Sequence, residues 1–232
     1  MKRIRSFLAI LVIIAVCAAG LPAHKAQAAE ELMQEAVTEE LAKPVVAKLK
    51  NTYSGIRVAW SESDGADGYY VYRKQTNVSN HKNDKDWEKI AETDAEVYID
   101  DTVLNNTRSD TYKYEYKVQA VKADDSGEII LSPISERRAI YRLTRPGVVI
   151  NKYGKTSIEL YITGIKGSFD GTIVYRKGPG ESSYTRVEKQ PSSAYQDWDL
   201  IEGETYSYRI CVYKSKSKST VSKEIVITCG AK

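Results

Sequence analysis

Hydrophobic and polar residues alternate with a period of two along most of the chain after Pro44. The alternating runs are short, as in GYYVYRK (68–74), and clusters of Gly, Asp, Asn and Ser separate them. This pattern is typical of strands that bury one face, because successive side chains of a strand point to opposite sides. The chain from residue 44 onwards is therefore predicted to be all-β.

The same succession of strands occurs twice. Five segments of 53–140 match five segments of 155–228 in the same order. The clearest match pairs GYYVYRK (68–74) with GTIVYRK (171–177), and the last pairs TYKYEYKV (111–118) with TYSYRICV (205–212). Ordered matches of this kind predict an internal duplication of a unit of about 90–100 residues. Each unit has about seven short strands with turn signals between them, which indicates a β-sandwich.

The alternation also predicts which side chains face the core. On the strand 68–74, Val71 should point inward, and Tyr70 and Tyr72 outward. On the equivalent strand 171–177, Val174 should point inward and Ile173 outward. The chain contains 17 Tyr, a residue that favours strands and combines an apolar ring with a polar tip. Such a composition suits a thin sandwich in which many side chains lie between core and water.

The N-terminal 43 residues lack this strand-like alternation of hydrophobic and polar positions. Residues 1–28 form a basic start, an apolar run and an Ala-Gln-Ala site, which predicts a signal peptide cleaved before Ala29. Lipidation at Cys17 and an uncleaved anchor are the alternatives. The apolar run is about 15 residues, short for a spanning helix, so no stable membrane insertion is expected after cleavage. Residues 29–43 are rich in Glu, Ala and Leu and are predicted to be a short helical linker that ends before Pro44.

Removing the predicted signal changes the charge balance. The whole chain has 34 basic and 31 acidic residues, but 1–28 holds four basic residues and no acidic one. The remaining chain has one more acidic than basic residue, so no general attraction to nucleic acid is expected. The run Lys214 to Lys218 alternates Lys with Ser and is interpreted as a solvated hairpin tip, with an anion-binding patch as the alternative.

In the first unit Trp60 ends one predicted strand, GADGYYVYR (65–73) leads into the next, and Tyr114, Tyr116, Val118 and Ala120 alternate along a later one. With these residues, the two units resemble fibronectin type III domains, especially the version repeated in secreted and surface proteins of Gram-positive bacteria. The resemblance implies immunoglobulin-like sandwiches at 44–143 and 144–232. It implies that Trp60 is a core residue near the end of the second strand. It also implies that Tyr114 and Tyr208 are core residues at the tyrosine-corner position, where the hydroxyl bonds back to the preceding turn.

The second unit departs from this pattern at one core position. Ile162 stands where the family would place the core Trp. Two interpretations are open: Trp198 fills part of the missing volume from another strand, or the second core is smaller.

Candidate chemistry is sparse. His81, the one His left after signal removal, lies in a polar loop, and no motif of a nucleophile with its base, a phosphate loop or a zinc site occurs. Asp100 and Asp197 are matched by the duplication and are interpreted as turn residues, with a Ca²⁺ site as the alternative. Cys211 and Cys229 lie too far apart along a predicted hairpin for a disulfide. We therefore predict no enzyme activity, no cofactor and no metal.

A surface is the remaining functional candidate. Outward Tyr70, Tyr72 and Tyr175, together with Trp87, form the candidate ligand-binding surface, since exposed rings can stack on sugars or anchor a protein. The alternative is that these are ordinary strand residues.

These expectations define a secreted, non-enzymatic binding or spacer protein, with cell-surface association left open. Its role would be extracellular adhesion or cell-surface assembly. Its partners would be an extracellular protein or a cell-wall or other glycan polymer. A carbohydrate-binding accessory protein for polysaccharide degradation is the alternative function.

Overall fold

The computed structural model describes residues 40–230, and within this range the chain is entirely β-sheet and loop. The prediction of an all-β protein is therefore confirmed. The predicted signal peptide and most of the predicted linker lie outside the described residues. The end of the linker, 40–43, is described and is not helical. The helix prediction is wrong there, because Leu41 is buried in the first core and holds this segment extended.

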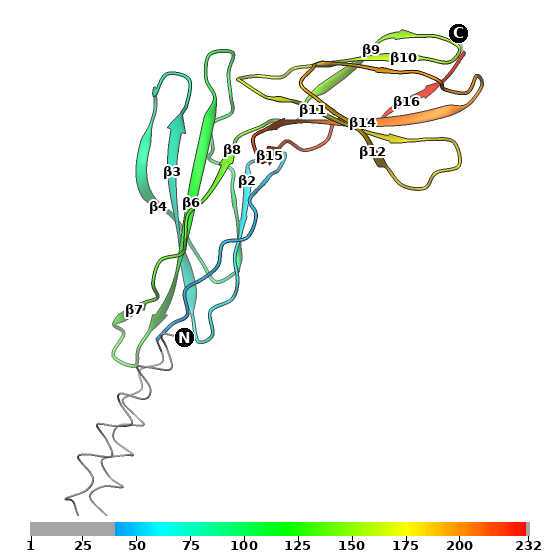
Figure 1. Ribbon diagram of the computed structural model, residues 1–232. Coiled ribbons are helices and arrows are strands. Elements are labelled where there is room, and N and C mark those ends of the chain that lie inside the picture. Colours follow the sequence, from blue (N-terminus) through cyan, green and yellow to red (C-terminus); the bar gives the residue numbers. More distant parts are fainter. Residues whose placement is uncertain (1–39, 231–232) are drawn as a thin grey trace, which may run out of the picture. The chain divides into compact units, whose positions relative to one another are not determined.

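The first sandwich consists of two sheets that enclose one core (Figure 1). One sheet has the order β1-β2-β5, and the other has the order β4-β3-β6-β7 with β8 also paired to β6. Its strands are β1 (Lys50–Asn51), β2 (Ile56–Ala59), β3 (Gly68–Asn77), β4 (Lys85–Thr93), β5 (Val97–Asp100), β6 (Tyr112–Ala123), β7 (Ile129–Leu131) and β8 (Arg138–Tyr141).

The second sandwich repeats this plan. One sheet has the order β13-β10-β9, and the other has the order β12-β11-β14-β15 with β16 also paired to β14. Its strands are β9 (Gly147–Tyr153), β10 (Ile158–Thr163), β11 (Gly171–Lys177), β12 (Thr185–Gln190), β13 (Ala194–Asp197), β14 (Thr205–Lys214), β15 (Ser217–Lys218) and β16 (Ile225–Thr228).

Side-chain alternation places these residues on the faces that the sequence predicts, although one of the outward residues is buried. On β3, Val71 is fully buried, whereas Tyr70 and Tyr72 are half-buried on the outer face. On β11, Val174 belongs to the second core. Ile173 points away from that core but is only 1% exposed, because it lies at the junction between the sandwiches.

The core positions also differ from expectation in one respect. Trp60 is 6% exposed and packs edge-on against Tyr69. Ile162 is equally buried in the second core. Trp198 is 61% exposed, so the interpretation that it fills the missing volume is wrong. The second core is built without a Trp.

The tyrosine corner lies at different residues in the two copies. In the first copy, the Tyr114 hydroxyl accepts a bond from the Leu104 amide at 2.7 Å. In the second, Tyr206 does the equivalent, accepting from the Ile201 amide at 3.1 Å. Tyr208 is buried but does not occupy the corner, so that assignment is wrong. The sequence match of the last strands is two residues out of register with the structural one.

A buried ion pair joins the two sheets of each sandwich. On β3, Arg73 donates from Nη1 to both oxygens of Asp100 on β5, at 3.1 and 3.0 Å. Arg176 and Asp197 repeat this geometry at the same distances. The bond from Tyr116 to Asp100, at 2.7 Å, has its counterpart in the bond from Tyr208 to Asp197, at 2.8 Å. The Asp residues interpreted as turn positions therefore also link the sheets.

The chain passes directly from one core to the next. Ile140 packs in the first core and Leu143 in the second. Between them, Arg142 is 2% exposed, and its guanidinium donates to the Gly55 carbonyl at 2.9 Å and to the Thr52 carbonyl at 3.1 Å. Burial lowers the pKa of Arg142, which has neutral oxygens as its hydrogen-bond partners.

Asn51 fastens the junction. Its amide nitrogen donates to the Tyr141 carbonyl and the Lys218 carbonyl, both at 2.9 Å. Its oxygen accepts from the Leu143 amide at 3.2 Å. A further bond runs from the Tyr141 amide to the Ser217 hydroxyl at 2.9 Å. The two sandwiches are thus joined by hydrogen bonds as well as by covalent linkage.

Both described cysteines are buried and free. Cys211 lies opposite Ile173 on β14, whereas the Cys229 amide bonds to Glu204, just before that strand begins. No helix between residues 40 and 230 has the length and apolar character needed to cross a membrane.

Replacing Arg73 by Met should destabilise the first sandwich by about 3 kcal/mol, because it leaves the Asp100 carboxylate buried without its cation. Arg176→Met should have a smaller effect, since the Arg176 side chain is 32% exposed and that of Arg73 only 6%. Denaturant unfolding of both variants measures the difference. Arg73→Met/Asp100→Asn should recover part of the loss, and equal losses for the two single variants would contradict this account.

Burial raises the pKa of Tyr114, Tyr116, Tyr195 and Tyr208 above the ordinary value of 10.0. A folded-state pKa raised in this way leaves stability unchanged below pH 10 and reduces it as pH rises further. Absorbance titration of the phenols should therefore show exposed tyrosines ionising first. The buried ones should ionise later, together with the loss of β-sheet circular dichroism. A single reversible titration near pH 10 with an unchanged spectrum would refute this.

Candidate functional site

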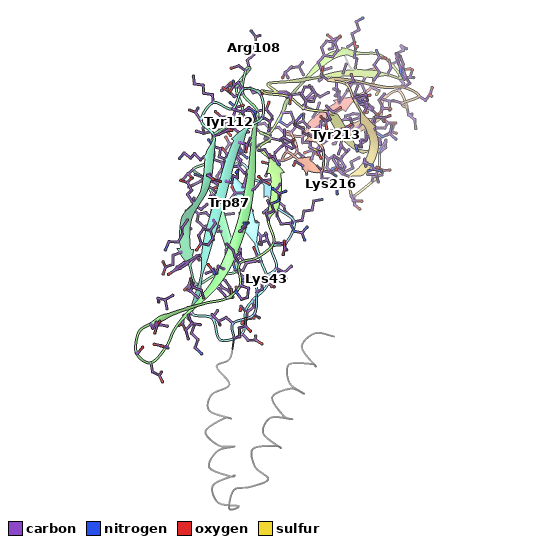
Figure 2. All side chains as sticks on the ribbon, turned by 60° about the vertical axis from the view of Figure 1, so that its left-hand side comes forward. Lys43, Trp87, Arg108, Tyr112, Tyr213 and Lys216 are labelled. Atoms are coloured by element: carbon purple, nitrogen blue, oxygen red, sulfur yellow. The ribbon has the colours of Figure 1, made fainter. Side chains whose placement is uncertain are left out.

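Three predicted surface residues lie together on the outer face of the first sandwich, and we call them the aromatic surface: Tyr70, Tyr72 and Trp87. Tyr70 and Tyr72 project from β3, while Trp87 comes from β4, which pairs with β3. Figure 2 shows Trp87 on this part of the chain. All three are half-buried.

Lysines cover two of these rings. Lys89 Nζ lies 3.8 Å from the centre of the Tyr70 ring, and Lys117 Nζ lies 4.4 Å from the centre of a ring of Trp87. Both lysines pair opposite Tyr72 in the sheet register, one from β4 and one from β6. A ligand that stacks on either ring would have to displace an ammonium group, at a cost of about 0.5–1 kcal/mol at an exposed site.

The hydroxyl of Tyr72 is held in place by a neighbouring strand. It donates to Gln119 Oε1 at 3.2 Å. Because Gln119 is anchored in turn through its amide nitrogen to the Ser132 carbonyl at 2.7 Å, this ring has a defined orientation.

A hollow of about 490 Å³ adjoins Tyr70. Its lining includes the carboxylates of Asp67, Glu92 and Asp94 and the apolar side chain of Ile129, which is 51% exposed. Carboxylates beside a ring can accept hydrogen bonds from sugar hydroxyls or from donors on a protein partner. The aromatic surface therefore borders a hollow whose acidic side chains could accept hydrogen bonds from a ligand.

The fourth predicted residue, Tyr175, does not join the aromatic surface. It lies on β11 of the second sandwich, and its pKa is raised, mainly by burial and also by the nearby Cys211. Nearby rings of that sheet are again covered by cations. Arg209 Cζ lies 4.5 Å from the centre of Tyr184, and Lys189 Nζ lies 4.5 Å from the centre of Tyr213.

The other sequence candidates are placed as follows. His81 is exposed in the loop after β3, where its Nδ1 lies 2.9 Å from Asp84. That contact and the backbone bond from Asn77, which is the larger cause, lower the pKa of Asp84. Within the described part of the chain, no three His, Cys, Asp or Glu side chains are grouped as metal ligands.

Sequence reasoning missed the cations that pair with the matched acids. Arg73 and Arg176 occupy the same place in the two VYRK segments, just as Asp100 and Asp197 occupy the same place in the matched strands before the corner. A charged residue repeated on the inward side of a strand was the available signal. It was not used because the acids were assigned to turns.

Comparisons with known proteins found weak likenesses to solved structures and no relative by sequence. No family model and no curated protein matches the chain. Among solved structures, the segment of two fibronectin type III domains from chicken tenascin is 14% identical with a TM-score of 0.37, over 82% of this chain and 99% of that one. The FN1–FN3 domains of chicken CNTN1 are 16% identical with a TM-score of 0.37, over 81% and 68%.

Because a TM-score of 0.37 carries no argument, the assignment of the fold rests on the order and pairing of the strands. Each half of the chain pairs a three-stranded sheet with a larger sheet around its own core and has a tyrosine corner. This arrangement defines a tandem, fibronectin type III-like β-sandwich protein.

Lys117→Ala should uncover the Trp87 ring and lower the free energy of unfolding by about 0.5 kcal/mol, the value of an exposed cation–π contact. Acrylamide quenching of Trp fluorescence, measured in a Trp198→Phe background to remove the exposed Trp, should increase. Lys122→Ala on the same strand is the charge-matched control. Equal quenching in the two variants would show that Lys117 does not shield the ring.

Proposed function

We propose that this chain is a secreted, non-enzymatic module that binds an extracellular partner and spaces it from other components. The hydrogen-bonded junction is the observation that carries this proposal. Asn51 bonds to Tyr141 and to Lys218, and Tyr141 bonds to Ser217, so that the two sandwiches form one unit. A two-domain unit joined in this way suits a spacer, because it resists the free flexing of a long linker.

Residues 1–28 support the extracellular location, since they have the pattern of a cleaved signal. The resemblance to repeated domains of Gram-positive secreted and surface proteins supports the same environment. Adhesion or cell-surface assembly is the role that these features favour, with a wall or other glycan polymer or an extracellular protein as partner.

The aromatic surface is the proposed contact for that partner. Tyr72 presents a half-exposed ring, and Tyr70, whose ring Lys89 covers, borders the hollow that Asp67 and Glu92 line, so one partner can meet an aromatic ring and hydrogen-bond acceptors together. Aromatic side chains are typical anchors of protein interfaces. They are also typical anchors of small-molecule sites.

The alternative, a carbohydrate-binding accessory protein, has less support. Such a protein needs two or three bare rings in one plane. Here Tyr70 and Trp87 are covered by Lys89 and Lys117, and Tyr175 belongs to the other sandwich.

Pull-down of the purified chain with insoluble cell walls and a panel of polysaccharides tests the proposed contact. Tyr70→Ala/Tyr72→Ala/Trp87→Ala should bind at least about tenfold more weakly, because several contact rings are lost together. Tyr53→Ala/Tyr161→Ala, which removes two exposed tyrosines elsewhere, should bind as the unaltered chain does.

Circular dichroism of each variant confirms that the sandwiches remain folded. Binding that is unchanged in the triple variant would rule out the aromatic surface as the contact and leave its tyrosines as strand residues.

A further inference from the structure

A second hollow, of about 590 Å³, lies at the junction of the sandwiches, and we call it the junction groove. Its volume falls within the range of about 300–1,000 Å³ that is usual for ligand pockets. It is formed by the residues before β1, by β8, and by β11, β12, β14 and β15. Its lining residues are Lys48, Leu49, Arg138, Ala139, Ile140, Ile173, Lys189, Tyr213, Ser215, Lys216, Ser217 and Lys218.

Five of these side chains are cations, and none is a carboxylate: Lys48, Arg138, Lys189, Lys216 and Lys218. Within residues 40–230, none of the five has a carboxylate within 4.0 Å. Without these five, the described residues have more acidic than basic side chains. The lining of the groove is therefore positively charged.

The turn that carries two of the lysines is held in a defined conformation. Ser215 adopts a left-handed backbone with φ of 52°, and its amide bonds to Asp170 at 2.7 Å. Tyr213 pairs with Lys218 across the hairpin. The predicted hairpin tip is thus confirmed, and its lysines are directed by a bonded turn.

The junction bonds fix the same hairpin against the first sandwich. The Ser217 hydroxyl accepts from the Tyr141 amide, and the Lys218 carbonyl accepts from Asn51, both at 2.9 Å. Lys216 and Lys218 consequently share one groove with Arg138, which comes from the other sandwich. Convergence of cations from both halves of the chain increases the attraction for one multiply charged ligand.

Three hydrophobic residues, Leu49, Ile140 and Ile173, also border the groove but are only 7%, 3% and 1% exposed, so its accessible lining is largely polar and charged. Tyr213 adds a ring that is already covered by Lys189 Nζ at 4.5 Å. Figure 2 shows Tyr213 and Lys216 near one another at this place.

We propose that the junction groove binds an acidic segment of a polysaccharide, one that bears carboxylate or sulfate groups. The cations of the groove would pair with the acidic groups through charge-assisted hydrogen bonds. A single-stranded nucleic acid fits less well, because such ligands bind by stacking bases on bare aromatic rings, and here Lys189 covers Tyr213.

The junction groove is distinct from the aromatic surface, and this proposal does not depend on the proposed contact there. Its lining shares no residue with the hollow beside Tyr70. The two sites also prefer different ligands, since the hollow beside Tyr70 is lined by carboxylates and would repel an acidic glycan.

Isothermal titration of the purified full chain tests the proposal with defined probes. These are a heparin hexasaccharide as sulfated glycan, an oligogalacturonate as carboxylated glycan, dextran as neutral glycan and a single-stranded DNA oligonucleotide. We expect one or both acidic glycans to bind, with an affinity that falls as salt rises, and dextran not to bind. Comparison of the first two probes shows which acidic group is preferred.

Two variants with equal changes in net charge separate a site from general attraction. Lys48→Gln/Lys189→Gln/Lys216→Gln/Lys218→Gln should weaken acidic glycan binding at least about tenfold, because it removes four charge-assisted contacts. Lys82→Gln/Lys152→Gln/Lys166→Gln/Lys223→Gln removes exposed lysines from elsewhere and should change the affinity by less than about twofold. Unfolding curves of both variants verify their folding.

Three results would overturn the proposal: no binding of either acidic glycan, an equal loss of affinity in the two variants, or DNA binding as tight as glycan binding with the same dependence on the groove lysines. The variant Tyr70→Ala/Tyr72→Ala/Trp87→Ala should keep its affinity for the acidic glycan. Failure at one site is therefore distinguishable from failure at the other.

Discussion

In each sandwich a salt bridge between an Arg and an Asp holds the two sheets together. Arg73 reaches from β3 across the core to Asp100 on β5, and Tyr116 on β6 donates to the same carboxylate. Burial disfavours a charged Arg73, but its bonds to Glu88 and Asp100 outweigh that effect and raise its pKa. The Asp100 carboxylate on β5 therefore fixes the positions of β3, β5 and β6 relative to one another. Because any shift of these strands would leave a buried charge unpaired, the arrangement specifies one packing of the sheets.

The same logic extends to the junction, with neutral acceptors in place of a carboxylate. Arg142 is buried between the cores and is surrounded by backbone carbonyls and amide oxygens, including those of Gly55 and Asn51. A guanidinium can satisfy several acceptors at once because its donors lie in a rigid plane. Arg142 thus fixes the loop before β2 against the segment that enters the second core. The segment that leads into the second sandwich is therefore bonded to the loop of the first sandwich that contains Thr52 and Gly55.

These two constraints position the aromatic surface and the junction groove, the two surfaces for which we propose ligands. The sheet β4-β3-β6 is held from inside by Arg73, so its outer face presents Tyr70 and Tyr72 in a fixed row beside Lys89 and Lys117. The junction brings Lys216 and Lys218 beside Arg138. The bonds that join the sandwiches thus also bring cations of both sandwiches to one groove.

Much of the fold was predictable from the sequence, because β-structure has a local signature. A period of two identifies strands and their buried faces, and it placed Val71 and Val174 in their cores and Tyr70 and Tyr72 outside. Repetition of VYRK in matching surroundings indicated two similar sandwiches. Of the four residues predicted to share one surface, Tyr70, Tyr72 and Trp87 lie on neighbouring strands of one sheet, whereas Tyr175 lies in the other sandwich.

Register was harder to predict, for a physical reason. On the strand that contains Tyr114 and Tyr116, tyrosines recur every second residue, so a shift by two positions keeps every ring on the same face. The sequence match accordingly aligned Tyr208 with Tyr114, whereas the loop before the strand decides that Tyr206 forms the corner.

The sequence by itself determined the fold class, the duplication and the faces of the strands, because these depend on neighbours along the chain. Only the tertiary structure decided which cations pair with Asp100 and Asp197 and which converge on the junction groove, because those contacts join residues far apart in the sequence.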